Sequence, residues 1–167
     1  MYLNKATNKL DPAGGSSAGL TLDINTRSLQ TVTVGGSAGK LSQGSSNVYI
    51  GYETAKNISS SYNDCYIGYQ AGYNGNQTNS MTVIGSGAGL SILRSYETVL
   101  VGAWSGAAAL SCVQSVGVGA YTLNQFANGF GVVAIGYRSA ERLLSGSFSV
   151  YVGWRNLGGM EACVART

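Results

Sequence analysis

The stretches NVYIGYETAKN at residues 47–57 and CYIGYQAGYN at residues 65–74 share one pattern, a β-rich triplet that ends in glycine. The triplet returns along the chain, and the interval between marker glycines is 16 residues once and 17 thereafter. A fixed period of this length is typical of stacked-coil proteins. We therefore expect an all-β protein, a β-solenoid (β-roll or β-helix) of about eight 17-residue coils. The marker glycines are Gly35, Gly51, Gly68, Gly85, Gly102, Gly119, Gly136 and Gly153.

Composition agrees with an ordered repeat. The 167 residues include 25 glycines but only one proline, and 44% of them are hydrophobic, which is too apolar for a disordered linker. The glycines are therefore expected at fixed backbone positions. Charged residues number 17, with a net charge of +3 spread along the chain. No basic patch marks a nucleic-acid surface, so we expect no nucleic-acid partner.

Each coil is expected to hold a strand before its marker glycine. The residues one and three positions before the glycine are almost all β-branched, and they alternate with a third column between them. Alternation of this kind predicts a strand with one buried face. We expect the two β-branched columns to stack as the core ladders. They are Val34, Ile50, Ile67, Ile84, Val101, Val118, Ile135 and Val152, and Val32, Val48, Cys65, Thr82, Val99, Val116, Val133 and Val150.

The rest of each coil can be predicted by counting positions after the marker glycine. A small residue three positions after the glycine predicts a tight corner, and an apolar residue seven positions after it predicts a second, looser strand. The runs SSSYND, NQTNS and LSGSF are expected to form turns. The small residues are Ala38, Thr54, Ala71, Ala88, Ser105, Thr122, Ser139 and Asn156, and the apolar ones are Ile58, Ile92, Ala109, Phe126, Leu143 and Met160.

Aromatic residues also fall in columns. Stacked rings stabilise a solenoid and cover glycine backbone, so a structural ladder is one interpretation. A surface strip that stacks on sugars is the other. The candidate surface-binding aromatics are Tyr49, Tyr66, Tyr52, Tyr69, Tyr137, Tyr151, Trp104 and Trp154.

Two units are expected. Residues 1–29 fall outside the register and are predicted to be an attachment arm or cap, with Leu20, Leu22 and Ile24 alternating as a lone strand. Residues 30–167 form the repetitive domain. The first 15 residues have no apolar core of the kind found in signal peptides. The uncharged stretch 98–120 keeps the 17-residue phase, so we expect coils there and no membrane insertion.

Chemistry-bearing residues are sparse. The chain has no histidine, which removes the commonest acid–base group and every Ser-His or Cys-His dyad. Its seven carboxylates are scattered, and only Glu53 shares a column with other long polar side chains, Gln70 and Arg138. The cysteines, Cys65, Cys112 and Cys163, are expected to be free and to act as small hydrophobes. We expect no catalytic residue, no cofactor and no metal site.

Three cassettes carry a family resemblance: NVYIGYETAKN, CYIGYQAGYN, and VAIGYRSAERL at residues 133–143. Together they resemble the head repeats of trimeric autotransporter adhesins, and more closely the repeats of bacteriophage tail fibres. The resemblance covers residues 30–160. It implies a homotrimer with the rolls side by side around a threefold axis. The period of 17 is longer than in the autotransporter heads. The chain is also similar to hexapeptide-repeat acyltransferases, which use a histidine that is absent here.

The resemblance implies a non-enzymatic protein of the virion surface. The leading expectation is a trimeric spike or short tail fibre of a tailed bacteriophage, attached to other virion proteins through residues 1–29 and contacting host-surface glycans. One alternative is a capsid decoration protein, or head spike. A second alternative is a bacterial surface adhesin module, which ranks lower because no export signal is recognised. Tail fibre and decoration protein stay open at this point.

Overall fold

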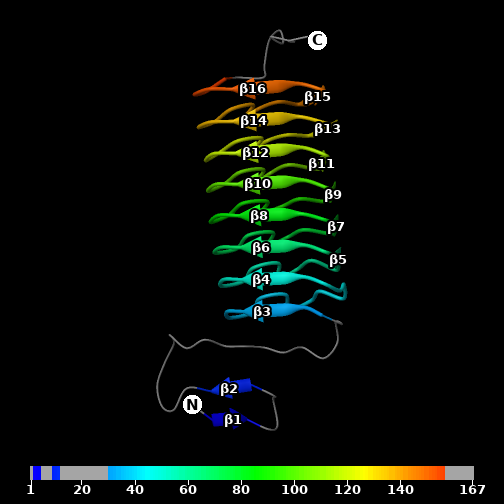
Figure 1. Ribbon diagram of the computed structural model, residues 1–167, viewed down its shortest axis with the longest axis vertical. Coiled ribbons are helices and arrows are strands. Elements are labelled where there is room, and N and C mark those ends of the chain that lie inside the picture. Colours follow the sequence, from blue (N-terminus) through cyan, green and yellow to red (C-terminus); the bar gives the residue numbers. More distant parts are fainter. Residues whose placement is uncertain (1, 5–8, 12–29, 157–167) are drawn as a thin grey trace.

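The structure of the protein is a computed structural model, which describes residues 2–4, 9–11 and 30–156 (Figure 1). The described residues form strands and turns and contain no helix. Strands β1 (Tyr2–Asn4) and β2 (Lys9–Asp11) pair as an antiparallel hairpin. The other strands belong to two parallel sheets. The larger sheet contains β3 (Val32–Val34), β4 (Val48–Ile50), β6 (Cys65–Ile67), β8 (Thr82–Ile84), β10 (Val99–Val101), β12 (Val116–Val118), β14 (Val133–Ile135) and β16 (Val150–Val152). The smaller contains β5 (Ser60–Tyr62), β7 (Gln77–Asn79), β9 (Arg94–Tyr96), β11 (Ser111–Val113), β13 (Asn128–Phe130) and β15 (Ser145–Ser147).

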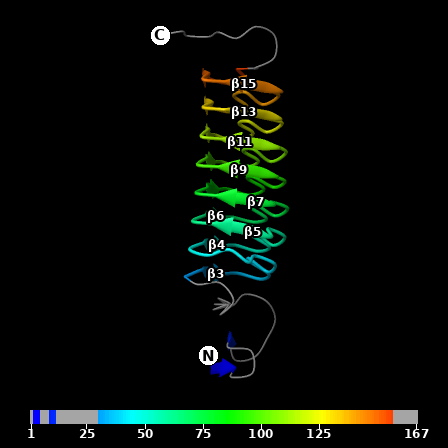
Figure 2. The ribbon, with the colours of Figure 1, turned by 90° about the vertical axis from the view of Figure 1, so that its right-hand side faces the viewer.

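The two sheets are two sides of one parallel β-solenoid. In the eight-stranded sheet Val32 pairs with Val48, and Val99 pairs with Val116, so each coil lies directly on the equivalent residues of the one before. The eight strands are separated by seven steps, which gives about seven turns. At about 4.8 Å per step the stack is about 34 Å long. Figures 1 and 2 show the stack as a straight column with the two sheets on adjoining sides. The β-solenoid expected from the glycine period is confirmed.

The marker glycines end the strands of the larger sheet. Gly102 has a φ of +132°, which residues with a side chain rarely adopt. A Cβ on Gly102 would also lie 2.4 Å from the carbonyl oxygen of Gly119 in the next coil. The same close contact between a marker glycine and the carbonyl oxygen of the next one recurs from Gly35 to Gly136, because equivalent turns are stacked on one another. Glycine is therefore required at this phase both by backbone angle and by space.

The core lies on the other side of the larger sheet from the one expected. The middle residue of each strand points inward, and Tyr49, Val83 and Leu100 are fully buried there. The two β-branched columns point outward: Ile50 is 37% exposed and Ile135 is 41% exposed. The assignment of those columns as core ladders was therefore wrong. The inward column is Thr33, Tyr49, Tyr66, Val83, Leu100, Gly117, Ala134 and Tyr151.

Side-chain size explains why the inward column is so mixed. The solenoid is narrow, so a large residue at one point of a coil needs a small one opposite it. A Cβ on Gly106 would lie 2.6 Å from Leu100. Where the inward residue is Gly117, the position equivalent to Gly106 is Leu123, which is buried beside Phe126. Interiors are close-packed, and each coil meets that demand with its own combination.

The second strand of each coil also differs from expectation. It forms within the runs that were assigned to turns: Ser60–Tyr62 lies in SSSYND, and Gln77–Asn79 lies in NQTNS. The small polar residues at the centre of these strands face inward, and Ser61, Thr78 and Ser95 are buried. The apolar residues seven positions after the glycine precede the strand and are buried as expected: Ile58, Ile92, Ala109, Phe126 and Leu143. Met160 lies outside the described residues.

The expected small-residue corner is confirmed as a turn, and its small side chains are buried. Its members from Ala38 to Ser139 are all buried. Backbone hydrogen bonds between coils continue around this corner, as in the bond from Gly106 N to Thr122 O at 2.8 Å. Small side chains are needed here because the corner brings the backbone into the interior between the two sheets. Of that column, Asn156 is partly exposed.

The uncharged stretch 98–120 folds as part of the stack. It contains β10, β11 and β12, which pair with the strands of neighbouring coils. Within the described part of the chain, no helix is long and apolar enough to span a bilayer. The expected lone strand at Leu20, Leu22 and Ile24 lies outside the described residues, as does the end of the repetitive domain from 157 to 167.

Candidate functional site

The most extended surface feature is the outer side of the eight-stranded sheet. It carries the two β-branched columns, 16 positions that we call the Val/Ile face. Fourteen of them are Val or Ile, and the other two are Cys65 and Thr82. Exposure ranges from partial at Val116 to 62% at Val152. The columns run along the whole stack, because the register places each member on the equivalent residue of the coil before.

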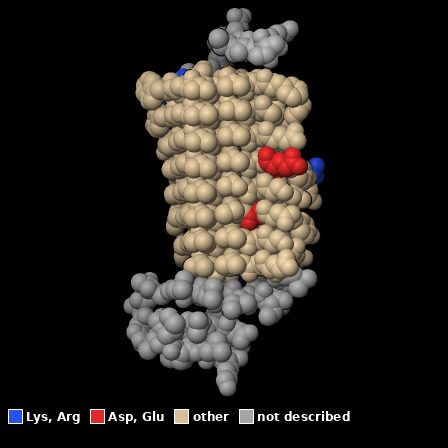
Figure 3. Space-filling view, in the orientation of Figure 1, with Lys and Arg blue, Asp and Glu red and all other residues tan. Residues whose placement is uncertain are grey.

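No charged residue interrupts the Val/Ile face at any of its 16 positions. Figure 3 shows this side of the solenoid, where rows of uncharged side chains run along the axis and acidic atoms are visible at two places, one near the middle of the view and one nearer its edge. The solvent-exposed face of a sheet usually carries polar and charged side chains. A continuous apolar surface of this length indicates an interaction surface.

The candidate aromatics divide into two groups. Tyr49, Tyr66 and Tyr151 belong to the inward column and are at most 5% exposed. They are core residues and present no ring to solvent, so the expectation of a surface role is wrong for these three. The sequence could not separate them from the exposed tyrosines because both groups flank the same marker glycine.

The other five candidates are exposed at the corner after the marker glycine: Tyr52, Tyr69, Trp104, Tyr137 and Trp154. The rings of Tyr52 and Tyr69 stack with centroids 5.9 Å apart and planes 11° apart. Tyr137 and Trp154 stack in the same way at 6.4 Å. Sugars bind aromatic residues through an open ring face, and stacking covers one face of each partner. The arrangement therefore favours the structural ladder, with Trp154, at 70% exposed, the most open ring.

Removal of the Tyr52–Tyr69 stack should weaken the solenoid modestly. We expect the Tyr52→Ala and Tyr69→Ala changes to be coupled by about 0.5–1.5 kcal/mol in a double-mutant cycle, because each removes the same ring contact. Urea unfolding of the wild type, both single variants and the double variant measures the coupling. The matched pair Tyr52→Ala and Trp154→Ala, at opposite ends of the ladder, should be additive. Equal coupling in both pairs would contradict a local stack.

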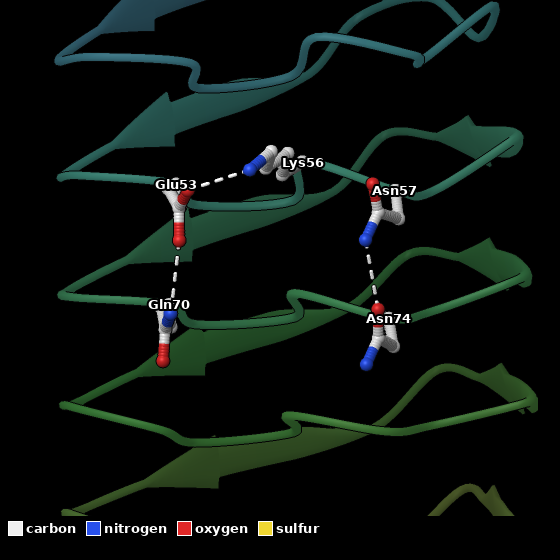
Figure 4. Close-up of polar contacts among 5 residues, drawn as sticks. All are labelled: Glu53, Lys56, Asn57, Gln70 and Asn74. Atoms are coloured by element: carbon white, nitrogen blue, oxygen red, sulfur yellow. Dashed lines mark hydrogen bonds and ion pairs between the residues drawn. The ribbon is translucent and has the colours of Figure 1, made fainter.

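Polar side chains form short ladders on the same corner (Figure 4). The Glu53 carboxylate accepts hydrogen bonds from Lys56 Nζ at 2.5 Å and from Gln70 Nε2 at 2.9 Å. The hydrogen bond from Lys56 lowers the pKa of Glu53 below its ordinary value. Asn57 Nδ2 donates to Asn74 Oδ1 at 2.8 Å in the next coil. Gln70 belongs to the column that contains Glu53, so the expected polar column joins neighbouring coils and uses both oxygens of its carboxylate.

A buried carboxyl group lies inside the solenoid, four positions before the marker glycine. Asp64 is 2% exposed, and it accepts hydrogen bonds from Met81 N at 2.8 Å and Thr78 Oγ1 at 2.6 Å. Burial raises the pKa of Asp64 to about 6, although these hydrogen bonds act in the opposite direction. Sequence reasoning missed the inward orientation of Asp64. The available signal was the equivalent residue of the previous coil, Asn47, which is another short polar side chain able to bond the next backbone N–H.

Two tyrosines lie near this carboxyl group. Burial raises the pKa of Tyr49, whose hydroxyl is hydrogen-bonded to Ser42 and Ser61. Burial also holds the pKa of Tyr66 well above its ordinary value. These phenols stay protonated at any physiological pH. The cluster is a closed interior feature of the first coils.

The described cysteines are free, as expected for Cys65 and Cys112. Burial raises the pKa of the Cys112 thiol to about 12, so it carries almost no thiolate at neutral pH. Cys65 belongs to the Val/Ile face and is partly exposed. Cys163 lies outside the described residues. Among those residues, no cluster of three or more His, Cys, Asp or Glu side chains could hold a metal ion.

Comparison with protein-family models, with curated proteins and with solved structures found no match for this chain.

Proposed function

We propose that this chain is a non-enzymatic structural protein of a virion surface, a homotrimeric spike or short tail fibre of a tailed bacteriophage. The observation that carries the proposal is the Val/Ile face, an apolar surface that runs the length of a straight stack and suits lateral association of copies. The resemblance of the glycine-marked cassettes to tail-fibre repeats supports the same role.

The use of polar groups within the stack supports a structural role. The Glu53 carboxylate is engaged by Lys56 and Gln70, and the Asp64 carboxylate by Thr78 and a backbone N–H. Side chains that are engaged in joining successive coils are not free to act on a substrate. A rod of stacked coils, in turn, holds its two ends apart, which is the mechanical task of a spike.

In this proposal, residues 1–29 join the chain to other virion proteins, and a host-surface glycan is the candidate ligand. Exposed aromatic side chains, with Trp154 the most open, are the groups suited to contact it. A capsid decoration protein has the same requirements for a rigid rod and an attachment segment. Location on the particle separates the two roles.

Immunogold electron microscopy of native particles, with antibodies against the full-length chain, tests the proposal. Label at the tail tip or tail fibres supports the fibre role. Label over the capsid replaces that role with decoration. Particles that carry no label at either place overturn the assignment to a virion surface, and label on bacterial cells alone supports the adhesin alternative. An array of host glycans probed with the full-length chain tests the ligand separately.

A further inference from the structure

The Val/Ile face is larger than the scattered apolar residues of an ordinary surface. A Val or Ile side chain has on the order of 100 Å² of apolar surface. With roughly a third of it open across the 16 positions, the face exposes roughly 500 Å², near the upper limit for the largest apolar patch of a typical monomer. Two such faces in contact would bury about 1,000 Å², which is the lower bound for a specific interface.

The regular spacing of the two columns favours another copy of this chain as the partner of the Val/Ile face. The strands carry their outward side chains in two columns, with members about 4.8 Å apart along the axis. Another copy of the chain has the same columns at the same spacing, so its side chains fit between these over the whole stack. An unrelated surface would match only locally. The absence of charge at all 16 positions also removes like-charge repulsion between two identical faces.

The other surfaces of the solenoid are less suited to contact between two copies of the chain. The outer side of the six-stranded sheet includes Gln77, Arg94 and Asn128, and the corner carries Glu53 and Lys56. Desolvating these groups would cost free energy with no matched partner on an identical surface. The Val/Ile face has no such cost.

We propose that copies of this chain associate through the outer face of the eight-stranded sheet, with the Val/Ile columns of one copy packed against those of another. This inference rests on the proposed self-association and names its surface. The sheets lie about 10 Å apart across the contact, the usual distance between packed sheets. The two-column width of the face suits either two copies face to face or three around an axis, and the mass of the particle in solution gives the number.

Sedimentation equilibrium of the full-length chain and of strand-matched variants tests the surface. The test variant is Val116→Lys with Val118→Lys, both outward in β12. The control is Ser111→Lys with Val113→Lys, both outward in β11 of the same coil but on the six-stranded sheet. We expect the wild type and the control to sediment as the same multiple of 17.2 kDa, and the test variant as a single 17.2 kDa chain with an unchanged β-type circular dichroism spectrum.

A milder pair covers the case in which the lysine variant does not fold. Val116→Thr with Val118→Thr keeps the β-branched shape that suits a strand but adds a hydroxyl to each contact. This pair should raise the dissociation constant at least tenfold relative to the control. If the variant with Val116→Thr and Val118→Thr associates as tightly as the wild type, the Val/Ile face is not the contact surface, although the chain still self-associates. A wild type that sediments as a single chain at 100-micromolar concentration overturns both.

Discussion

Gly102→Ala is expected to unfold the middle of the solenoid at temperatures where the wild type is intact. The alanine would hold a φ near +132° at a cost of about 1–3 kcal/mol. Its Cβ would also meet the Gly119 carbonyl oxygen at 2.4 Å, which forces two stacked coils apart. Together these effects should exceed about 4 kcal/mol. For a chain of this size that corresponds to a fall of about 10 °C or more in Tm, measured by thermal circular dichroism.

Two further glycines are matched controls for Gly102. Gly153 has nearly the same φ, +133°, but no atom of the described residues lies within 4 Å of its Cβ position, so Gly153→Ala tests backbone strain without the collision. Gly131 lies between β13 and β14, is partly exposed and has a φ of +66°, and the equivalent residues of the neighbouring coils, Gln114 and Phe148, carry side chains at a similar positive φ. Gly131→Ala should cost about 1 kcal/mol. Equal losses at Gly102 and Gly131 would show that stacking of the marker glycines is not the cause.

Asp64→Asn is expected to stabilise the protein at neutral pH and to remove a pH dependence. The folded-state pKa of Asp64, about 6, lies above its ordinary value of 3.8. The folded state therefore holds a proton that the unfolded state has released, and stability falls as pH rises from about 4 to about 6. Above that range the folded chain carries a buried carboxylate at a cost of about 3 kcal/mol. Removing the charge should recover most of this free energy.

The previous coil shows how an asparagine fits this position. Asn47 Oδ1 accepts a hydrogen bond from Asp64 N at 2.9 Å, and Asn47 Nδ2 donates to Ser61 O at 2.8 Å. Thr78 pairs in register with Ser61, so an asparagine at 64 can bond Met81 N and Thr78 O in the same way.

Urea unfolding at a series of pH values measures the effect of Asp64→Asn. The difference in unfolding free energy between the variant and the wild type should be about 2–3 kcal/mol at pH 7.5 and close to zero at pH 3.5. Exposed carboxylates titrate in both proteins and cancel in this difference, and Tyr49 and Tyr66 titrate far above the range. A difference that does not change between pH 3.5 and pH 7.5 would overturn the assignment of the pH dependence to Asp64.

Several parts of the fold could be predicted from the sequence. The glycine period predicted a solenoid, the strands before each marker glycine and a small-residue corner after it, and the structure confirms all three. These features could be predicted because each depends on a local backbone requirement that is the same in every coil. Gly102 illustrates it: the backbone angle and the neighbouring backbone both require glycine, whatever fills the core.

The candidate site and the second strand of each coil were harder to predict from the sequence. The strand at Ser60–Tyr62 was assigned to a turn because its composition is polar and small. Only its central side chain, Ser61, faces inward, and it is hydrogen-bonded to the Tyr49 hydroxyl on the opposite side of the coil, where a small residue fits. The surface role of Tyr49 failed for the same reason. Local propensity describes the secondary structure that a segment prefers in isolation. In the solenoid, the side chains on the opposite side of the coil decide which residues fit inward and whether the segment forms a strand.

The sequence by itself determined the repeat, its length and the stacking of equivalent residues in successive coils. The tertiary structure alone decided which side of the main sheet is the interior. Alternation along a strand specifies two faces but not which one is covered, and here the more uniformly apolar face lies outside. The interior must vary from Tyr66 to Gly117 because each coil has to match the size of its own opposite wall. The outer face has no such constraint, so its Val and Ile columns stay regular along the entire stack.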